Sequence, residues 1–133
     1  MSQDGEIVDL LRAKVEDLVL VYRFGSTANR TAHRESDVDL ALLAKTRLSS
    51  SARWELQSAL ASALRREVDL VDLRAASTVL QMQVVSSGEL LFEGNALERQ
   101  RFEMLVFSSY ARLNEERKAI LQRIREEGRV YGR

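Results

Sequence analysis

Three short apolar runs, rich in β-branched and aromatic residues, most constrain the fold of this chain. They lie at residues 19–24, 37–43 and 68–73, and each is predicted to form a strand. Between them, apolar residues recur at helical spacing over residues 5–17 and 51–66. Alternating helices and strands are typical of an α/β or α+β domain, here with a small mixed sheet flanked by helices.

The second half of the chain is predicted to end in one long helix. Ser77 is a candidate N-cap for a short helix that Gly88 closes as its C′ residue, and a short strand follows at residues 90–92. Residues 95–127 contain neither Gly nor Pro, and their apolar residues follow a helical stripe. We therefore expect one C-terminal helix over residues 95–127, broken at most once, in a single domain that spans residues 1–133. The residues assigned to the stripe are Leu97, Phe102, Leu105, Ser109, Leu113, Ile120 and Ile124.

Composition excludes several classes of function. Twenty Lys and Arg balance twenty Asp and Glu, which argues against a general nucleic-acid-binding surface. The absence of cysteine and the single histidine exclude disulfides, thiolate zinc sites, a Cys nucleophile and His-cluster metal sites, so that a hard metal ion would need carboxylate ligands. The sequence contains no signal-peptide pattern and no apolar run near the ~20 residues that span a bilayer. We expect a cytoplasmic protein without a membrane partner.

Two aspartates within an apolar strand are the first candidate site. Asp37 and Asp39 are expected to share one face of the strand, with Val38 turned into the core. Their Cα atoms would lie ~6.6 Å apart, a separation at which two carboxylates can bind one cation together or serve two. Oxygen ligands of this kind suit one or two Mg²⁺ ions.

A phosphate-binding turn is predicted ten residues before these aspartates. Gly25 lets a phosphate approach the backbone because it has no Cβ, and Ser26 offers a hydroxyl and the amide of a helix N-terminus. We expect that short helix to run to about residue 32.

A third carboxylate would complete the metal site, and the third strand offers two. Asp69 alternates with the core-facing residues Val68 and Leu70, whereas Asp72 has the opposite parity, so we assign Asp69 to the site. The structural alternative is that these aspartates cap turns, because a lone Asp-x-Asp is more often structural than catalytic. Two like charges on one strand face repel unless a cation neutralises them, and this favours the metal site.

The motif Gly25-Ser26-x10-Asp37-x-Asp39, with Asp69 on the third strand, resembles the signature of the DNA polymerase β-type nucleotidyltransferases. The small size resembles the minimal nucleotidyltransferase branch of that superfamily. Segments outside the motif are similar to the MntA antitoxins of HEPN/MNT toxin–antitoxin systems, and the similarity covers most of residues 1–125. These segments are Ser36–Asp39, Ala52–Leu56, Val68–Arg74 and Ala76–Leu80.

The resemblance implies a polymerase β-like fold and a Mg²⁺-dependent adenylyltransferase that uses ATP. It implies an antitoxin that transfers AMP to a tyrosine of its HEPN ribonuclease toxin and silences it, with Asp39 and Asp69 sharing the metal nearest the nucleophile and Asp37 and Asp39 holding the nucleotide metal. ATP and the HEPN toxin are then the partners, without direct nucleic-acid binding. Two other functions stay open: an antitoxin that masks its toxin by binding alone, and a nucleotidyltransferase that acts on a small hydroxyl compound.

Residues outside the motif have less specific interpretations. Tyr22 and Trp54 are expected to pack in the core, although Tyr22 could instead border the nucleotide pocket. Arg30, where family members often carry Gly, and His33 either contact phosphates or lie exposed in the loop. The long C-terminal helix is a candidate docking surface for the toxin, because its apolar residues exceed what one small sheet can cover.

Overall fold

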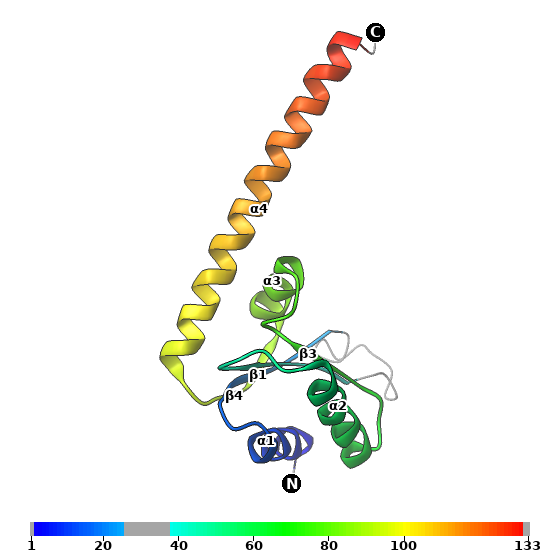
Figure 1. Cartoon of the computed structure of the whole chain (residues 1–133), viewed down its shortest axis with the longest axis vertical. Coiled ribbons are helices and arrows are strands. Elements are labelled where there is room, and N and C mark those ends of the chain that lie inside the picture. Colours follow the sequence, from blue (N-terminus) through cyan, green and yellow to red (C-terminus); the bar gives the residue numbers. More distant parts are fainter. Residues whose placement is uncertain (1, 26–37, 132–133) are drawn as a thin grey trace.

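The computed structural model describes residues 2–25 and 38–131, which form four helices and four strands (Figure 1). In chain order the elements are α1 (Gln3–Lys14), β1 (Leu18–Phe24), β2 (Val38–Ala44), α2 (Ser50–Leu64), β3 (Val68–Asp72), α3 (Thr78–Ser87), β4 (Glu89–Glu93) and α4 (Ala96–Tyr131). The expected strands and long helices are confirmed, with ends shifted by a few residues. The helix expected from Ser26 to about residue 32 lies outside the described residues.

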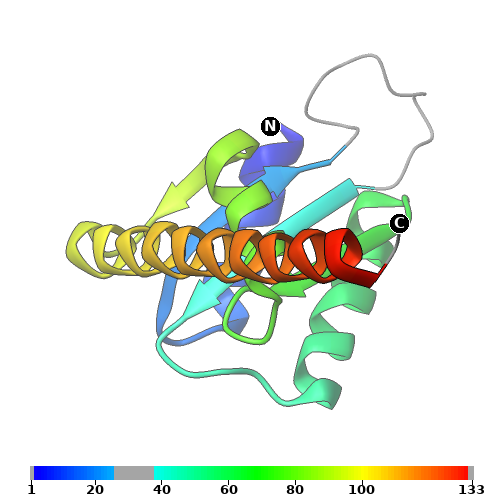
Figure 2. The same ribbon diagram turned by 90° about the horizontal axis from the view of Figure 1, so that it is seen from above.

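The sheet is mixed and its strand order is β3-β2-β1-β4. Strand β2 pairs with β3 in parallel, whereas β1 pairs antiparallel with both β2 and β4. Helices α1 and α2 cover one face, while α3 and the first part of α4 cover the other (Figures 1 and 2). Because both faces of β2 are packed, six of its seven residues are buried.

Serine caps define where two helices begin. The Ser49 hydroxyl accepts a hydrogen bond from the Ala52 amide at 3.1 Å, and that of Ser77 accepts one from the Leu80 amide at 3.2 Å. Gly88 ends α3 as expected, but as its C-cap residue in an extended conformation (φ −78°) rather than as a C′ residue. Its amide still donates to the Val84 carbonyl at 2.8 Å, so the last turn is closed without a left-handed residue.

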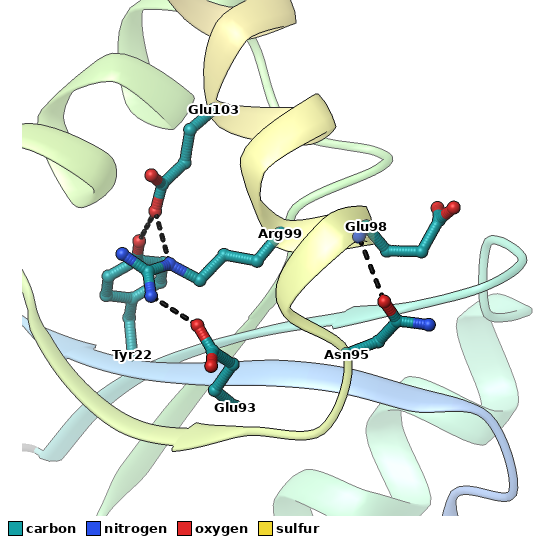
Figure 3. Close-up of polar contacts among 6 residues, drawn as sticks. All are labelled: Tyr22, Glu93, Asn95, Glu98, Arg99 and Glu103. Carbon is teal, nitrogen blue, oxygen red and sulfur yellow. Dashed lines mark hydrogen bonds and ion pairs between the residues drawn. The ribbon is translucent and has the colours of Figure 1, made fainter.

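Helix α4 begins where the Asn95 side chain accepts a hydrogen bond from the Glu98 amide at 3.1 Å (Figure 3). It runs for 36 residues without a break and projects far beyond the sheet (Figure 1). Phe102 and Val106 are its only buried side chains among the described residues. The predicted single C-terminal helix is therefore confirmed, and the sheet and α3 cover only its first turns. Leu97, Leu105, Ile120 and Ile124 of the apolar stripe are exposed, as expected for apolar residues that exceed what a small sheet can cover.

Two predictions about aromatic core residues have different outcomes. Tyr22 is buried, as expected, on the face of the sheet that α3 and α4 cover. Trp54 is 60% exposed, and its predicted core position is wrong. Helix α2 buries Leu56 and Leu60, and two residues correspond to about 200° of helical rotation, which places Trp54 on the opposite side. Within residues 2–25 and 38–131, no helix combines the length and apolarity needed to cross a membrane.

Truncation after Asn114 should leave the stability of the body unchanged. Every side chain from Glu115 to Gly128 is exposed, so removal of residues 115–133 takes away no core contact described here. Thermal denaturation followed by circular dichroism should give a melting temperature within about 2 °C of the full chain, as expected for the loss of surface residues alone. A melting temperature lower by 10 °C or more would show that residues 115–133 do stabilise the rest of the chain.

Candidate active site

The end of strand β1 lies directly against the carboxylate of Asp39. Gly25 follows the strand with φ +81°, a conformation that side-chain-bearing residues rarely adopt. A Cβ at this position would lie 2.2 Å from the Asp39 Oδ2 atom. Glycine is therefore required both by the backbone angle and by the carboxylate that occupies the space of the missing side chain.

The parallel pairing of β2 with β3 places Asp39 next to Asp69. These two residues are register partners, so their Cα atoms are about 4.8 Å apart and their side chains leave the sheet on the same face. The neighbouring residues Val38 and Val68 are buried on the other face, as the alternation predicts. Asp39 is half-buried and Asp69 is exposed.

Two of the predicted site residues, Ser26 and Asp37, lie outside the described residues. In the part of the chain that the structure describes, no three acidic or histidine side chains gather closely enough to hold a metal ion. The donor set that is present fits Mg²⁺, since Asp39 and Asp69 offer only carboxylate oxygens.

Asp72, the alternative third carboxylate, has a structural role. It is buried, and its two oxygens accept hydrogen bonds from the backbone amides of Leu48, at 2.8 Å, and Arg74, at 3.1 Å. These contacts tie the end of β3 to the connection between β2 and α2. The parity argument that separated Asp69 from Asp72 is thus confirmed for Asp72, which points away from the Asp39–Asp69 pair.

A polar cluster that the sequence analysis missed connects α4 to the sheet (Figure 3). The Tyr22 hydroxyl donates to Glu103, Arg99 Nε donates to the same carboxylate at 3.0 Å, and Arg99 Nη1 donates to Glu93. We call these four residues the Tyr22–Glu103 cluster.

Burial, reinforced by the carboxylate of Glu103, raises the pKa of Tyr22 well above its ordinary value, so the hydroxyl stays protonated and donates. The two carboxylates likewise raise the pKa of Arg99. The i,i+4 spacing of Arg99 and Glu103 was the one sequence signal for this cluster.

A cavity among the described residues lies at the end of β2 opposite to Asp39. It has a volume of about 730 Å³ and is lined by residues between the end of α1 and the start of α2, including Asp17, Ala44 and Glu55. Ala44 is five residues along β2 from Asp39, or about 17 Å at the rise of a strand. The cavity is lined by none of the predicted site residues.

A mixed sheet that carries paired aspartates beside Gly25 points to a nucleotidyltransferase. The family described as Polymerase beta, Nucleotidyltransferase matches residues 6–97, and the chain belongs to it. Protein adenylyltransferase MntA from Shewanella oneidensis is 48% identical over 118 residues, which cover 89% of this chain and 84% of that protein.

Two solved structures resemble the chain over nearly its whole length. One is a toxin–antitoxin with AMP-PNP, which has 46% sequence identity and a TM-score of 0.82 and covers 91% of this chain and 97% of its own. The other is an MNT antitoxin in complex with a tri-AMPylated Shewanella oneidensis HEPN toxin. It has 43% identity and a TM-score of 0.77, and covers 92% of this chain and 95% of its own. The predicted family and fold are therefore confirmed.

The two aspartates of β3 should differ in their effect on stability. Asp72→Ala removes the acceptor for two backbone amides and should lower the free energy of unfolding by about 2 kcal/mol. Asp69→Ala, on the same strand but exposed, should change it by less than about 0.5 kcal/mol. Urea denaturation of both variants measures the difference, and equal losses would contradict the assignment of Asp72 to structure and Asp69 to the site.

Proposed function

We propose that this protein is an antitoxin that transfers AMP from ATP to a tyrosine hydroxyl of its cognate HEPN toxin and thereby neutralises the toxin. The observation that carries the proposal is the register pairing of Asp39 with Asp69 on one sheet face, beside Gly25. The similarity to Protein adenylyltransferase MntA and to an antitoxin in complex with an AMPylated HEPN toxin supports the choice of acceptor. ATP is the substrate that donates AMP. We place the protein in the cytoplasm.

The proposed transfer is a displacement at the α-phosphorus of ATP. The hydroxyl oxygen of the toxin forms a bond to that phosphorus, the bond to the β-phosphate oxygen breaks, and pyrophosphate leaves while the hydroxyl proton is lost. Asp39 and Asp69, with Asp37, are the residues that we assign to hold Mg²⁺, and Gly25 and Ser26 those that receive the phosphates. When bound, Mg²⁺ neutralises phosphate charge and favours the deprotonated nucleophile.

The exposure of the site favours a protein acceptor over a small molecule. Asp69 is exposed, so that a side chain presented by another protein can reach it. The partner would then supply the wall that encloses the reacting groups and excludes water. A small hydroxyl compound would instead require an enclosed pocket, and the cavity of about 730 Å³ lies at the opposite end of β2.

The exposed apolar residues of α4 are the surface that we assign to toxin binding. Ile120, Leu121 and Ile124 are 48%, 51% and 59% exposed on a part of the helix that buries nothing in the body. Exposed apolar groups in such number mark a protein interface in a chain without membrane-spanning helices among its described residues. Nearer the sheet, Leu97, Met104, Leu105 and Phe107 are also exposed.

Asp39→Asn should abolish AMP transfer while folding and toxin binding persist, because it removes one carboxylate of the pair without changing side-chain size. Mass spectrometry of the toxin after incubation with ATP and Mg²⁺ should detect added AMP on tyrosine with the wild-type protein and none with the variant. Asp17→Asn, an exposed aspartate beside the distant cavity, is the matched control and should retain full transfer. An unmodified toxin with the wild-type protein would instead support neutralisation by masking.

The truncation after Asn114 should bind the toxin at least ten-fold more weakly than the full chain, because it removes apolar side chains of about 1.5–3 kcal/mol each on full burial. Calorimetric titration with the toxin measures the affinity. Binding of ATP and Mg²⁺ should be unchanged in the same preparation, which separates the loss of a docking surface from the loss of the fold. Unchanged toxin affinity would refute the assignment of this surface.

A further inference from the structure

The direction of α4 relative to the sheet depends on few contacts. The helix packs against α3 and β1 near its N-terminal end, where Phe102 and Val106 are buried. Apolar contacts such as these have no strong directional preference, because they depend mainly on the area removed from water. They hold the helix against the sheet but specify its angle only loosely.

The Tyr22–Glu103 cluster supplies the directional contacts at this junction. Glu103 receives the Tyr22 hydroxyl from β1 and Arg99 Nε from its own helix, while Arg99 also reaches Glu93 on β4 (Figure 3). The Glu103 and Arg99 side chains are 18% and 30% exposed, so these ion pairs are shielded from water more than ordinary surface pairs are. Hydrogen bonds to charged groups restrict both distance and angle, and here they connect one helix to two neighbouring strands.

The same strand carries the cluster and the candidate active site. Tyr22 pairs with Ala41 across the β1–β2 ladder, and Phe24, two residues on, pairs with Asp39. Tyr22 and Asp39 therefore lie on the same sheet face, two residues apart in the register. If α4 moves relative to Tyr22, it therefore also moves relative to Asp39 and Asp69.

The length of α4 amplifies any change in its angle. Ile124 is 21 residues beyond Glu103, or about 32 Å along the helix axis at 1.5 Å per residue. A tilt of about 10° at the cluster would move Ile124 by about 5 Å, which is more than the ~1 Å tolerance of a reacting geometry.

We propose that Tyr22 and Glu103 are positioning residues, which set the direction of α4 and so place the acceptor hydroxyl of a toxin bound to that helix over Asp39 and Asp69. The placement of the acceptor hydroxyl rests on the proposed function. The role of Tyr22 and Glu103 in setting the direction of α4 does not depend on that function. Tyr22 is therefore assigned to positioning rather than to the border of a nucleotide pocket.

The direction of α4 can be measured without the toxin. The chain has no cysteine, so Ala63→Cys on α2 and Lys118→Cys on α4, both exposed, provide two unique sites for spin labels. Pulsed electron paramagnetic resonance should give a narrow distance distribution for the otherwise wild-type chain, and a shifted or broadened one when Tyr22→Phe or Glu103→Gln is added. Glu98→Gln is the matched control, because the Glu98 carboxylate pairs with Arg101 on the same helix rather than with a strand, and it should leave the distribution unchanged. Unchanged distributions in both cluster variants would refute the proposal.

The consequence for transfer is measured by steady-state kinetics with the toxin. Tyr22→Phe and Glu103→Gln should raise the KM for the toxin by about ten-fold, the effect of one lost charge-assisted hydrogen bond, with the KM for ATP unchanged. A merely structural role would lower the melting temperature and leave the KM for the toxin unchanged while the variant is folded, and that result would overturn the proposal. Absence of transfer by the wild-type protein would refute the proposed function, and the label distances would still decide the role of the cluster.

Discussion

The pairing of strand β2 with both of its neighbours is the constraint on which the rest of the structure depends. Its antiparallel ladder with β1 sets Phe24 opposite Asp39, and its parallel ladder with β3 sets Asp69 beside it. Burial of Val38 and Leu40 on the opposite face holds this register, since a slip of one residue would turn Asp39 into the apolar core. Backbone hydrogen bonds and apolar burial thus bring two carboxylates together on one face of the sheet.

The sheet with its covering helices and the distal part of α4 are stabilised in different ways. The sheet is covered on both faces by apolar side chains, whereas α4 buries only two side chains in the described structure and continues as a free helix (Figures 1 and 2). Its distal part depends on its own backbone hydrogen bonds and on local pairs such as Gln122 with Glu126. An isolated helix of this kind gains little by exposing Ile120 and Ile124 to water. A partner that covers them accounts for their presence, and the Tyr22–Glu103 cluster accounts for the direction in which they are presented.

Much of the fold could be predicted from the sequence, because its strands and helices follow local patterns. Ser77 caps α3 as the sequence indicates, and the parity of β3 correctly separates Asp72 from the face that carries Asp69. The errors occur where burial depends on which element lies opposite. Trp54 is apolar yet exposed, because α2 packs on the sheet with the side that carries Leu56 and Leu60, and Trp54 lies on the opposite side of the helix. The contact of Tyr22 with Glu103 joins residues 81 positions apart, and no local pattern predicts such a pair.

The sequence by itself determined the class of the protein and the parity of its aspartates. Strand alternation and the spacing of Gly25 from Asp39 are local properties that any regular strand preserves. Only the tertiary structure decided that Asp39 lies beside Asp69, that its carboxylate fills the space over Gly25, and that α4 leaves the body along one direction. These features arise from pairing and packing between segments far apart in the chain. Their free energies depend on which surfaces meet, and that is information that no local pattern of residues carries.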